Sequence, residues 1–142
     1  MQAGREIKFR GKPIEDYGDV KWFYGSAVLD YEEKLAYIVS PGQGHVPVEW
    51  ESVGQFTEVH DDQDVGEELY EGDIVEVAHE GHIHICVVKY EGGSPMFAAD
   101  SLPDGFLWFS EILECDSSYW WANETKKIGN IHENPELLEV GK

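Results

Sequence analysis

The stretch Glu67-Glu68-Leu69-Tyr70-Glu71-Gly72-Asp73-Ile74-Val75 determines how the second half of the chain is interpreted. Gly72 can take a positive φ in a turn, and the Asp73 carboxylate can accept hydrogen bonds from neighbouring backbone amides. The apolar residues that follow, starting at Ile74, are typical of a strand. We therefore predict a tight turn at Gly72-Asp73 that leads directly into a β-sheet.

A β-hairpin is predicted immediately after this turn, because two segments rich in branched residues, 74–78 and 83–90, flank the turn Glu80-Gly81. Further breakers separate the elements that follow. We expect, in order, a strand at 96–99, a strand from 106 to 115 with one helical turn near 110–113, a closing strand at 127–131, and a helix at 134–139 with Asn134 as its cap and Pro135 at its first position.

The first half is also predicted to consist largely of strands. A hairpin is expected from segments 22–29 and 35–39, whereas the prolines and glycines of 40–47 predict a loop. Residues 60–66 contain three aspartates and are interpreted as an exposed acidic loop. We place the boundary between two domains, 1–66 and 67–142, at the end of this loop. Several short strands separated by glycine turns predict a mainly β fold, with an SH3-like β-barrel in the second half.

Charge is the strongest global feature of the chain. Its 142 residues include 29 aspartates and glutamates but only 10 lysines and arginines, which gives a formal net charge of −19. Such a surface repels phosphate, so direct binding of DNA or RNA is disfavoured. Four of the basic residues lie in 5–12, where we expect a strand at 6–10 with Ile7 and Phe9 in the core and its charged residues solvated.

The sequence contains no apolar stretch near the roughly 18 residues of a membrane-spanning helix, and it does not begin like a signal peptide. We therefore expect a cytoplasmic protein without membrane contacts. Cys86 lies between Ile85 and Val87, and Cys115 follows the apolar pair Ile112-Leu113. Both are interpreted as reduced thiols in or near the core.

One cluster has residue types that bind metals. His82, His84 and Cys86 fall on one face of a strand by the period of two, and His79 lies across the turn. Side chains two apart on one strand diverge, however, and zinc ligands usually come from different elements. The simpler interpretation is a set of polar hairpin residues, with Cys86 inert because its apolar surroundings raise its pKa. We predict no catalytic residue, no cofactor and no enzymatic activity.

Aromatic residues are the best candidates for a contact surface. Neighbouring residues of a strand point to opposite faces, so each aromatic cluster should place at least one ring outside the core. Our interface candidates are Trp22, Tyr119, Trp120 and Trp121. Alternatively, these rings cover the open ends of a small barrel.

Three separated stretches resemble a known family. They are Arg5-Glu6-Ile7-Lys8-Phe9-Arg10, then Val53-Gly54-Gln55-Phe56-Thr57 leading to Glu68-Leu69-Tyr70-Glu71-Gly72-Asp73-Ile74-Val75, and finally 128–138. In this order they resemble the YopX family of phage and prophage proteins. The resemblance implies an SH3-like second half, a smaller α+β first half available for oligomer contacts, and no assigned catalytic residues. Residues 115–126 look like an insertion relative to the family.

Two functions remain open. The chain is either a non-enzymatic binding or assembly module, whose partner is another protein or a second copy in a homo-oligomer, or an acidic mimic of nucleic acid. Such a mimic would occupy the basic site of a host DNA- or RNA-binding protein.

Overall fold

The computed structural model describes residues 7–138. The chain divides into two compact units, Met1–Phe56 (unit 1) and Thr57–Lys142 (unit 2), and the predicted boundary near residue 66 lies inside unit 2. Strands grouped in two sheets dominate the described residues, which confirms the mainly β class. The helical segments among residues 7–138 are short 3-10 turns. None of them has the length and apolar character that crossing a membrane would require.

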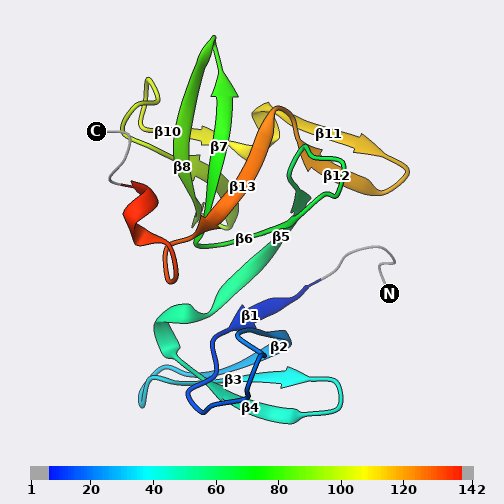
Figure 1. The fold of residues 1–142 in the computed structure, drawn as a ribbon, viewed down its shortest axis with the longest axis vertical. Coiled ribbons are helices and arrows are strands. Elements are labelled where there is room, and N and C mark those ends of the chain that lie inside the picture. Colours follow the sequence, from blue (N-terminus) through cyan, green and yellow to red (C-terminus); the bar gives the residue numbers. More distant parts are fainter. Residues whose placement is uncertain (1–6, 139–142) are drawn as a thin grey trace. The chain divides into compact units, whose positions relative to one another are not determined.

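Unit 1 is built from antiparallel strands (Figure 1). The strand β1 lies between β5 and β2, and β3 pairs with both β2 and β4. The predicted hairpin is therefore confirmed as β2 and β3. The elements are β1 (Phe9–Gly11), β2 (Phe23–Asp30), β3 (Leu35–Ser40), β4 (Gly44–Val48), the 3-10 turn η1 (Trp50–Ser52) and the first residues of β5 (Gly54–His60). The described part of unit 1 contains no α-helix, so the α+β character of this half is not confirmed.

Two predictions for unit 1 are wrong. Residues 44–48 form the strand β4 although a loop was predicted, because β4 is the last strand in the order of its sheet, where a proline such as Pro47 is tolerated. Ile7 lies before β1 and is exposed, and Arg10 in β1 is buried, the reverse of the expectation for these two residues. The Arg10 guanidinium lies over the Trp22 ring, 4.5 Å from its centroid, which gives the buried cation a favourable contact.

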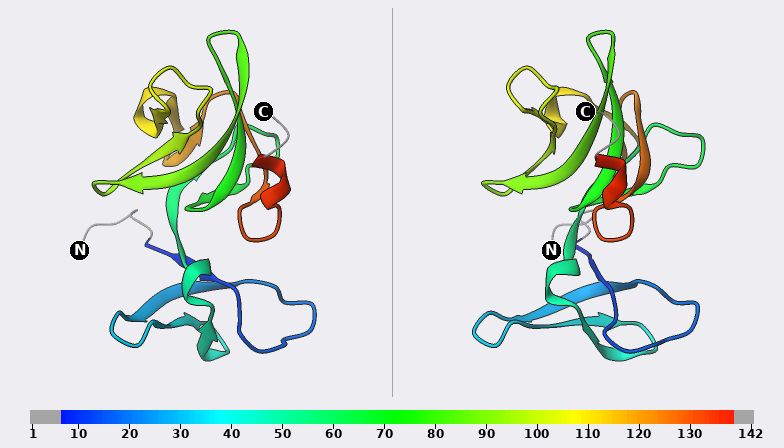
Figure 2. Two further views of the ribbon diagram at one scale, coloured as in Figure 1. Left: turned by 90° about the vertical axis from the view of Figure 1, so that its left-hand side faces the viewer. Right: turned by 60° about the vertical axis from the view of Figure 1, so that its left-hand side comes forward.

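Unit 2 contains a five-stranded antiparallel sheet in the order β10-β9-β8-β7-β13. Its longest hairpin, β7–β8, turns at Glu80 and Gly81, which both have positive φ and confirm the predicted turn. In Figure 2 the 3-10 turn η3 lies beside this hairpin, and it packs against β8. The elements are β6 (Glu68–Tyr70), β7 (Asp73–His79), β8 (His82–Glu91), β9 (Ser94–Ala98), β10 (Phe106–Trp108), η2 (Phe109–Glu111), β11 (Leu113–Asp116), β12 (Tyr119–Ala122), β13 (Thr125–Asn130) and η3 (Pro135–Leu138).

One face of the five-stranded sheet forms the core of unit 2. Side chains on β7, β8 and β9 alternate, and the inward set is almost completely buried: Val75, Val77, Cys86, Val88 and Phe97. The strands β10 and β13 are the edges of this sheet and are not paired with each other within residues 7–138. Closure into an SH3-like barrel is therefore not confirmed.

The predicted C-terminal helix is wrong within the described residues. Pro135–Leu138 form only the 3-10 turn η3, and the last predicted residue, Glu139, lies outside the described part. The Asn134 side chain accepts a hydrogen bond from the backbone amide of Asn130 (3.3 Å). This bond favours a turn directly after β13.

The stretch 67–75 forms the predicted turn before β7. Gly72 has φ 94°, and the Asp73 carboxylate accepts a hydrogen bond from the amide of Tyr70 (2.6 Å). Asp73 is completely buried, and the Lys127 ammonium lies 3.3 Å from its Oδ2 and donates to the carbonyl of Glu68 (3.1 Å). The side chain of Lys127 therefore links this stretch to β13, and the bond from Tyr70 to Asp73 holds the turn itself.

The acidic loop at 60–66 is not simply exposed, which corrects the prediction. Asp61 is buried, and its carboxylate accepts hydrogen bonds from the amides of Glu67 (2.9 Å) and Lys127 (2.8 Å). The Asp62 carboxylate accepts one from the amide of Glu124 (2.7 Å). These two aspartates fasten the loop to the start of β13, because carboxylates satisfy backbone donors that would otherwise be buried alone.

Candidate functional site

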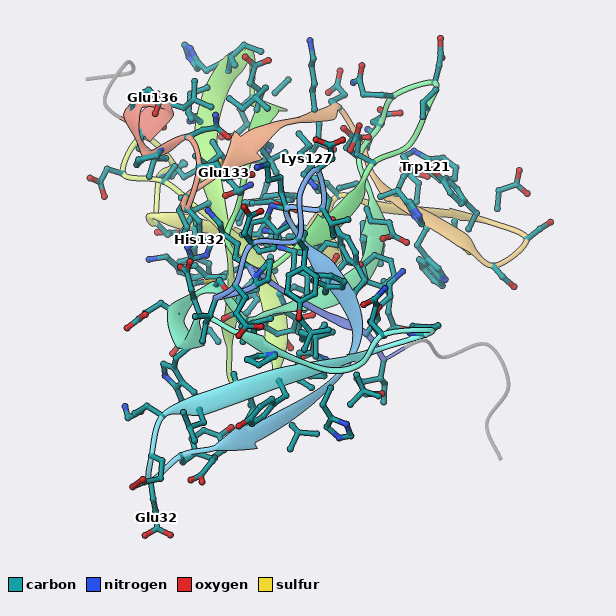
Figure 3. All side chains as sticks on the ribbon, turned by 60° about the horizontal axis from the view of Figure 1, so that its bottom comes forward. Glu32, Trp121, Lys127, His132, Glu133 and Glu136 are labelled. Carbon is teal, nitrogen blue, oxygen red and sulfur yellow. The ribbon has the colours of Figure 1, made fainter. Side chains whose placement is uncertain are left out.

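The strands β11 and β12 form a hairpin, here called the aromatic hairpin, that carries three of the predicted interface residues. Its register places Tyr119 opposite Asp116, Trp120 opposite Cys115, and Trp121 opposite Glu114. Because strand side chains alternate, Tyr119 and Trp121 share one face and Trp120 lies on the other. Figure 3 shows Trp121 on this hairpin. The hairpin overlaps the segment 115–126, which looks like an insertion in the sequence.

Tyr119 and Trp121 pack against the end of β5. The Tyr119 ring stacks on the His60 ring with 4.4 Å between centroids, and Trp121 pairs with His60 in a short parallel bridge. The imidazole Nδ1 of His60 lies 3.2 Å from the carbonyl oxygen of Trp120. A side chain at Gly66 would collide with the Tyr119 hydroxyl, so the glycine leaves room for this ring. These contacts fix the hairpin on unit 2.

The opposite face of the aromatic hairpin is apolar and ends in open solvent. Leu113 and Ala122, directly opposite each other, join the core at its base. Trp120 and Cys115 continue this face, and Trp120 is 40% exposed. Cys115 is also exposed, which contradicts the prediction of a thiol in or near the core. A tryptophan held on a rigid strand and left in water is typical of a protein contact.

The candidate metal ligands on β8 are divided between the surface and the core. His82 is exposed, whereas His84 is buried with its Nδ1 2.7 Å from the Ser101 hydroxyl oxygen. Cys86 lies in the core, and burial raises the pKa of its thiol to about 12, so it stays protonated and unreactive at neutral pH. Within residues 7–138 no three histidine, cysteine, aspartate or glutamate side chains gather as metal ligands.

Trp22, the remaining interface candidate, belongs to unit 1 and is half-buried beneath the Arg10 guanidinium. Its neighbour Tyr24 is more exposed, and Phe23 between them lies in the core. The alternation that we predicted for the aromatic clusters is therefore confirmed here. The ring of Trp22 is committed to a contact within unit 1.

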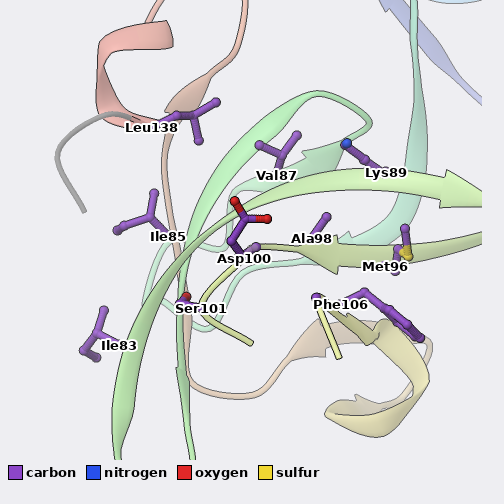
Figure 4. A pocket seen from close by; sticks show the side chains of 12 residues that line it. Ile83, Ile85, Val87, Lys89, Met96, Ala98, Asp100, Ser101, Phe106 and Leu138 are labelled. Atoms are coloured by element: carbon purple, nitrogen blue, oxygen red, sulfur yellow. The ribbon is translucent and has the colours of Figure 1, made fainter. Parts of the chain in front are cut away.

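Sequence reasoning missed a second surface of unit 2, on the outward face of the five-stranded sheet (Figure 4). A groove of about 610 Å³ lies there. Its lining is mostly apolar, with Lys89 and Asp100 as the only charged residues among those that line it. The apolar residues of this groove, called the apolar groove below, are Ile83, Ile85, Val87, Met96, Ala98, Ala99, Phe106 and Leu138. The alternation Ile83, Ile85, Val87 in β8 was the available signal, because it gives the strand a second apolar face.

Comparison with known families finds one that spans almost the whole chain. Residues 9–139 match the family described as YopX protein. No curated protein matches the chain significantly.

Proposed function

The chain belongs to the YopX family, and we propose that it works as a non-enzymatic protein-binding or assembly module. The aromatic hairpin would contact the partner, which is another protein or a second copy of the chain in a homo-oligomer. The observation that carries this proposal is Trp120, an exposed tryptophan on a strand that is fastened at its other face. Tryptophan is enriched among the residues that contribute most to binding energy.

The alternative, that the aromatic rings only cover the ends of a barrel, has less support. Trp120 and Tyr119 are 40% and 42% exposed, and the apolar face of the hairpin extends beyond Leu113 and Ala122 into solvent. A ring that served only to cover the core would be expected to be nearly completely buried.

Replacing Trp120 with serine should remove binding without unfolding the protein. Because the ring is 40% exposed and lies toward the outer end of the hairpin, the free energy of unfolding should fall by only about 1–2 kcal/mol, which leaves the protein folded. Light scattering should report any self-association, and affinity capture from bacterial lysate should report other partners; we expect the Trp120→Ser variant to lose whichever is found. Val28→Ser, which alters an exposed apolar residue of unit 1, is the matched control. Unchanged mass and unchanged captured proteins in the Trp120 variant would contradict the proposal.

The second candidate function is an acidic mimic of nucleic acid, which is favoured by the net charge of −19. Several carboxylates are engaged within the fold, however: Asp61 and Asp73 are buried, and Asp62 and Glu111 accept backbone hydrogen bonds. A mimic would bind its target with an affinity that falls steeply with salt. Capture that persists at high salt would therefore separate the first function from the second.

The cellular setting is part of the same proposal. We place the protein in the bacterial cytoplasm as a phage- or prophage-type accessory protein, with no enzymatic activity. The family resemblance supports this assignment, as do the two free cysteines, which are common in a reducing compartment. We also propose that unit 2 is related to SH3-like barrels. The observation that supports this is that one face of its antiparallel sheet packs on a single hydrophobic core.

A further inference from the structure

The apolar groove is an unpartnered face of a sheet whose other face is fully used. The register aligns Val87, Ala98 and Phe106 across three strands, and Ile83 and Ile85 continue the row along β8. Ile83 is 65% exposed and Phe106 is 37% exposed. A neighbouring segment contributes Leu138 from η3 (Figure 4). The groove volume lies within the range of about 300–1,000 Å³ that is usual for ligand sites.

A second, polar hollow adjoins this groove. It has a volume of about 290 Å³, and Phe106 lines both cavities. Three carboxylates line the hollow, those of Glu80, Asp104 and Glu111, while its basic side chains are limited to His79. Glu111 is held in place because its Oε2 accepts a hydrogen bond from the amide of Trp108 (2.9 Å). An apolar surface thus passes, at Phe106, into a negatively charged one.

We propose that the apolar groove and the acidic hollow together bind an extended segment of a partner protein in which apolar side chains are followed by lysine or arginine. The apolar side chains would be buried against Ile83, Ile85 and Met96, and the cation would reach the carboxylates of Glu80 and Asp104. Charge complementarity selects this occupant, because the net charge of −19 repels acidic segments and favours a basic one. Lys89, which lines the groove, opposes a second cation on the same segment at that point.

This inference goes beyond the aromatic hairpin, since it concerns a different sheet and names the chemistry of the partner. It does not require Trp120 to bind anything. Loss of partner capture in the Trp120→Ser variant and loss of segment binding in the groove variants are therefore separate results, and either can fail alone.

Fluorescence anisotropy with three labelled peptides tests the proposal on the full chain. The first peptide has leucine at alternating positions followed by two lysines, the second replaces the lysines by glutamates, and the third replaces the leucines by serines. We expect the first peptide to bind at least tenfold more tightly than the other two. Ile83→Asp should weaken it at least tenfold, while Val65→Asp, which adds the same charge at another exposed residue of unit 2, should leave binding unchanged.

The acidic hollow is tested by a matched pair of charge variants. Glu80→Gln with Asp104→Asn should weaken the leucine-lysine peptide several-fold, whereas Glu32→Gln with Glu33→Gln, exposed residues of unit 1, removes the same formal charge and should have no effect. Phe106→Ser serves as a second groove variant if Ile83→Asp loses its fold. Equal binding of the lysine and glutamate peptides, or binding of the leucine peptide no tighter than that of the serine peptide, would overturn the proposal.

Discussion

Alanine at position 25 is expected to unfold unit 1, at a cost of about 4 kcal/mol or more, in the range that marks severe backbone disruption. Gly25 lies in β2 with φ 156°, and a Cβ at this position would overlap the carbonyl oxygen of Val39 on the paired strand β3. That obstacle is backbone, so it cannot rotate away. Chemical unfolding followed by amide hydrogen exchange should show lost protection in the described residues of unit 1.

The neighbouring residue supplies the control for this experiment. Ser26 is exposed and lies directly opposite Val39 in the register, so Ser26→Ala changes the same strand pair without placing an atom against the backbone. Its free energy of unfolding should stay within about 0.5 kcal/mol of the wild-type value. A Gly25→Ala variant with the same stability as Ser26→Ala would show that β2 and β3 do not approach each other as described.

Replacing Lys127 with methionine is expected to destabilise unit 2 by about 3 kcal/mol, because removing one partner of a buried ion pair leaves the other charge poorly compensated. The Lys127 ammonium contacts the buried Asp73 carboxylate and the carbonyl of Glu68, while its own backbone amide donates to Asp61. Methionine keeps most of the apolar stem and the hydrogen bond of the backbone amide. The measured loss in the free energy of unfolding therefore comes mainly from removal of the ammonium group. Lys127 is labelled on β13 in Figure 3.

Urea unfolding of a double-mutant cycle separates this pair from its surroundings. The cycle combines Lys127→Met with Asp73→Asn, and the double variant should be more stable than the sum of the two single losses predicts. Lys126→Met, an exposed lysine one residue earlier, should have little effect. A Lys127→Met variant within about 0.5 kcal/mol of wild type would contradict the role that we assign to this cation.

The parts of the fold that the sequence predicted well are those in which local chemistry decides the structure. Gly72 and Asp73 form the expected turn, and Glu80-Gly81 connects β7 and β8, because positive φ and carboxylate bonding are local properties. Position along a sheet is not local. The strand β4 contains Pro47 because it lies at the end of its sheet, and that position depends on pairing with distant residues.

Two charged side chains are buried although the sequence places them in solvent, Asp61 and Arg10. The sequence places Asp61 in a solvated acidic loop. In the structure Asp61 is buried, and its carboxylate accepts hydrogen bonds from the backbone amides of Glu67 and Lys127. The Lys127 donor lies 66 residues away in the sequence, so the local composition of the loop does not predict this contact. Arg10 was misassigned for a similar reason, since its burial depends on the Trp22 ring.

The candidate surfaces were only half predictable. Strand alternation correctly implies that at least one ring among Tyr119, Trp120 and Trp121 lies outside the core, and both Tyr119 and Trp120 are exposed. The stacking of Tyr119 on His60 and the space for its ring at Gly66 are tertiary features that the sequence alone does not predict. The apolar groove is harder to predict, because the isoleucines of β8 alternate with histidines and the groove also needs side chains from β9, β10 and η3.

Site-specific photocrosslinking at position 120 tests the central claim, that the aromatic hairpin is a protein-binding surface, most directly. A benzophenone amino acid would replace Trp120 in the full chain, expressed in the cells that carry its gene, with the same group at Val28 as the control, since both side chains are well exposed. The account predicts a discrete covalent adduct with a protein, or with a second copy of the chain, at position 120 and not at position 28. Adducts absent from both positions, or equal at both, would contradict it.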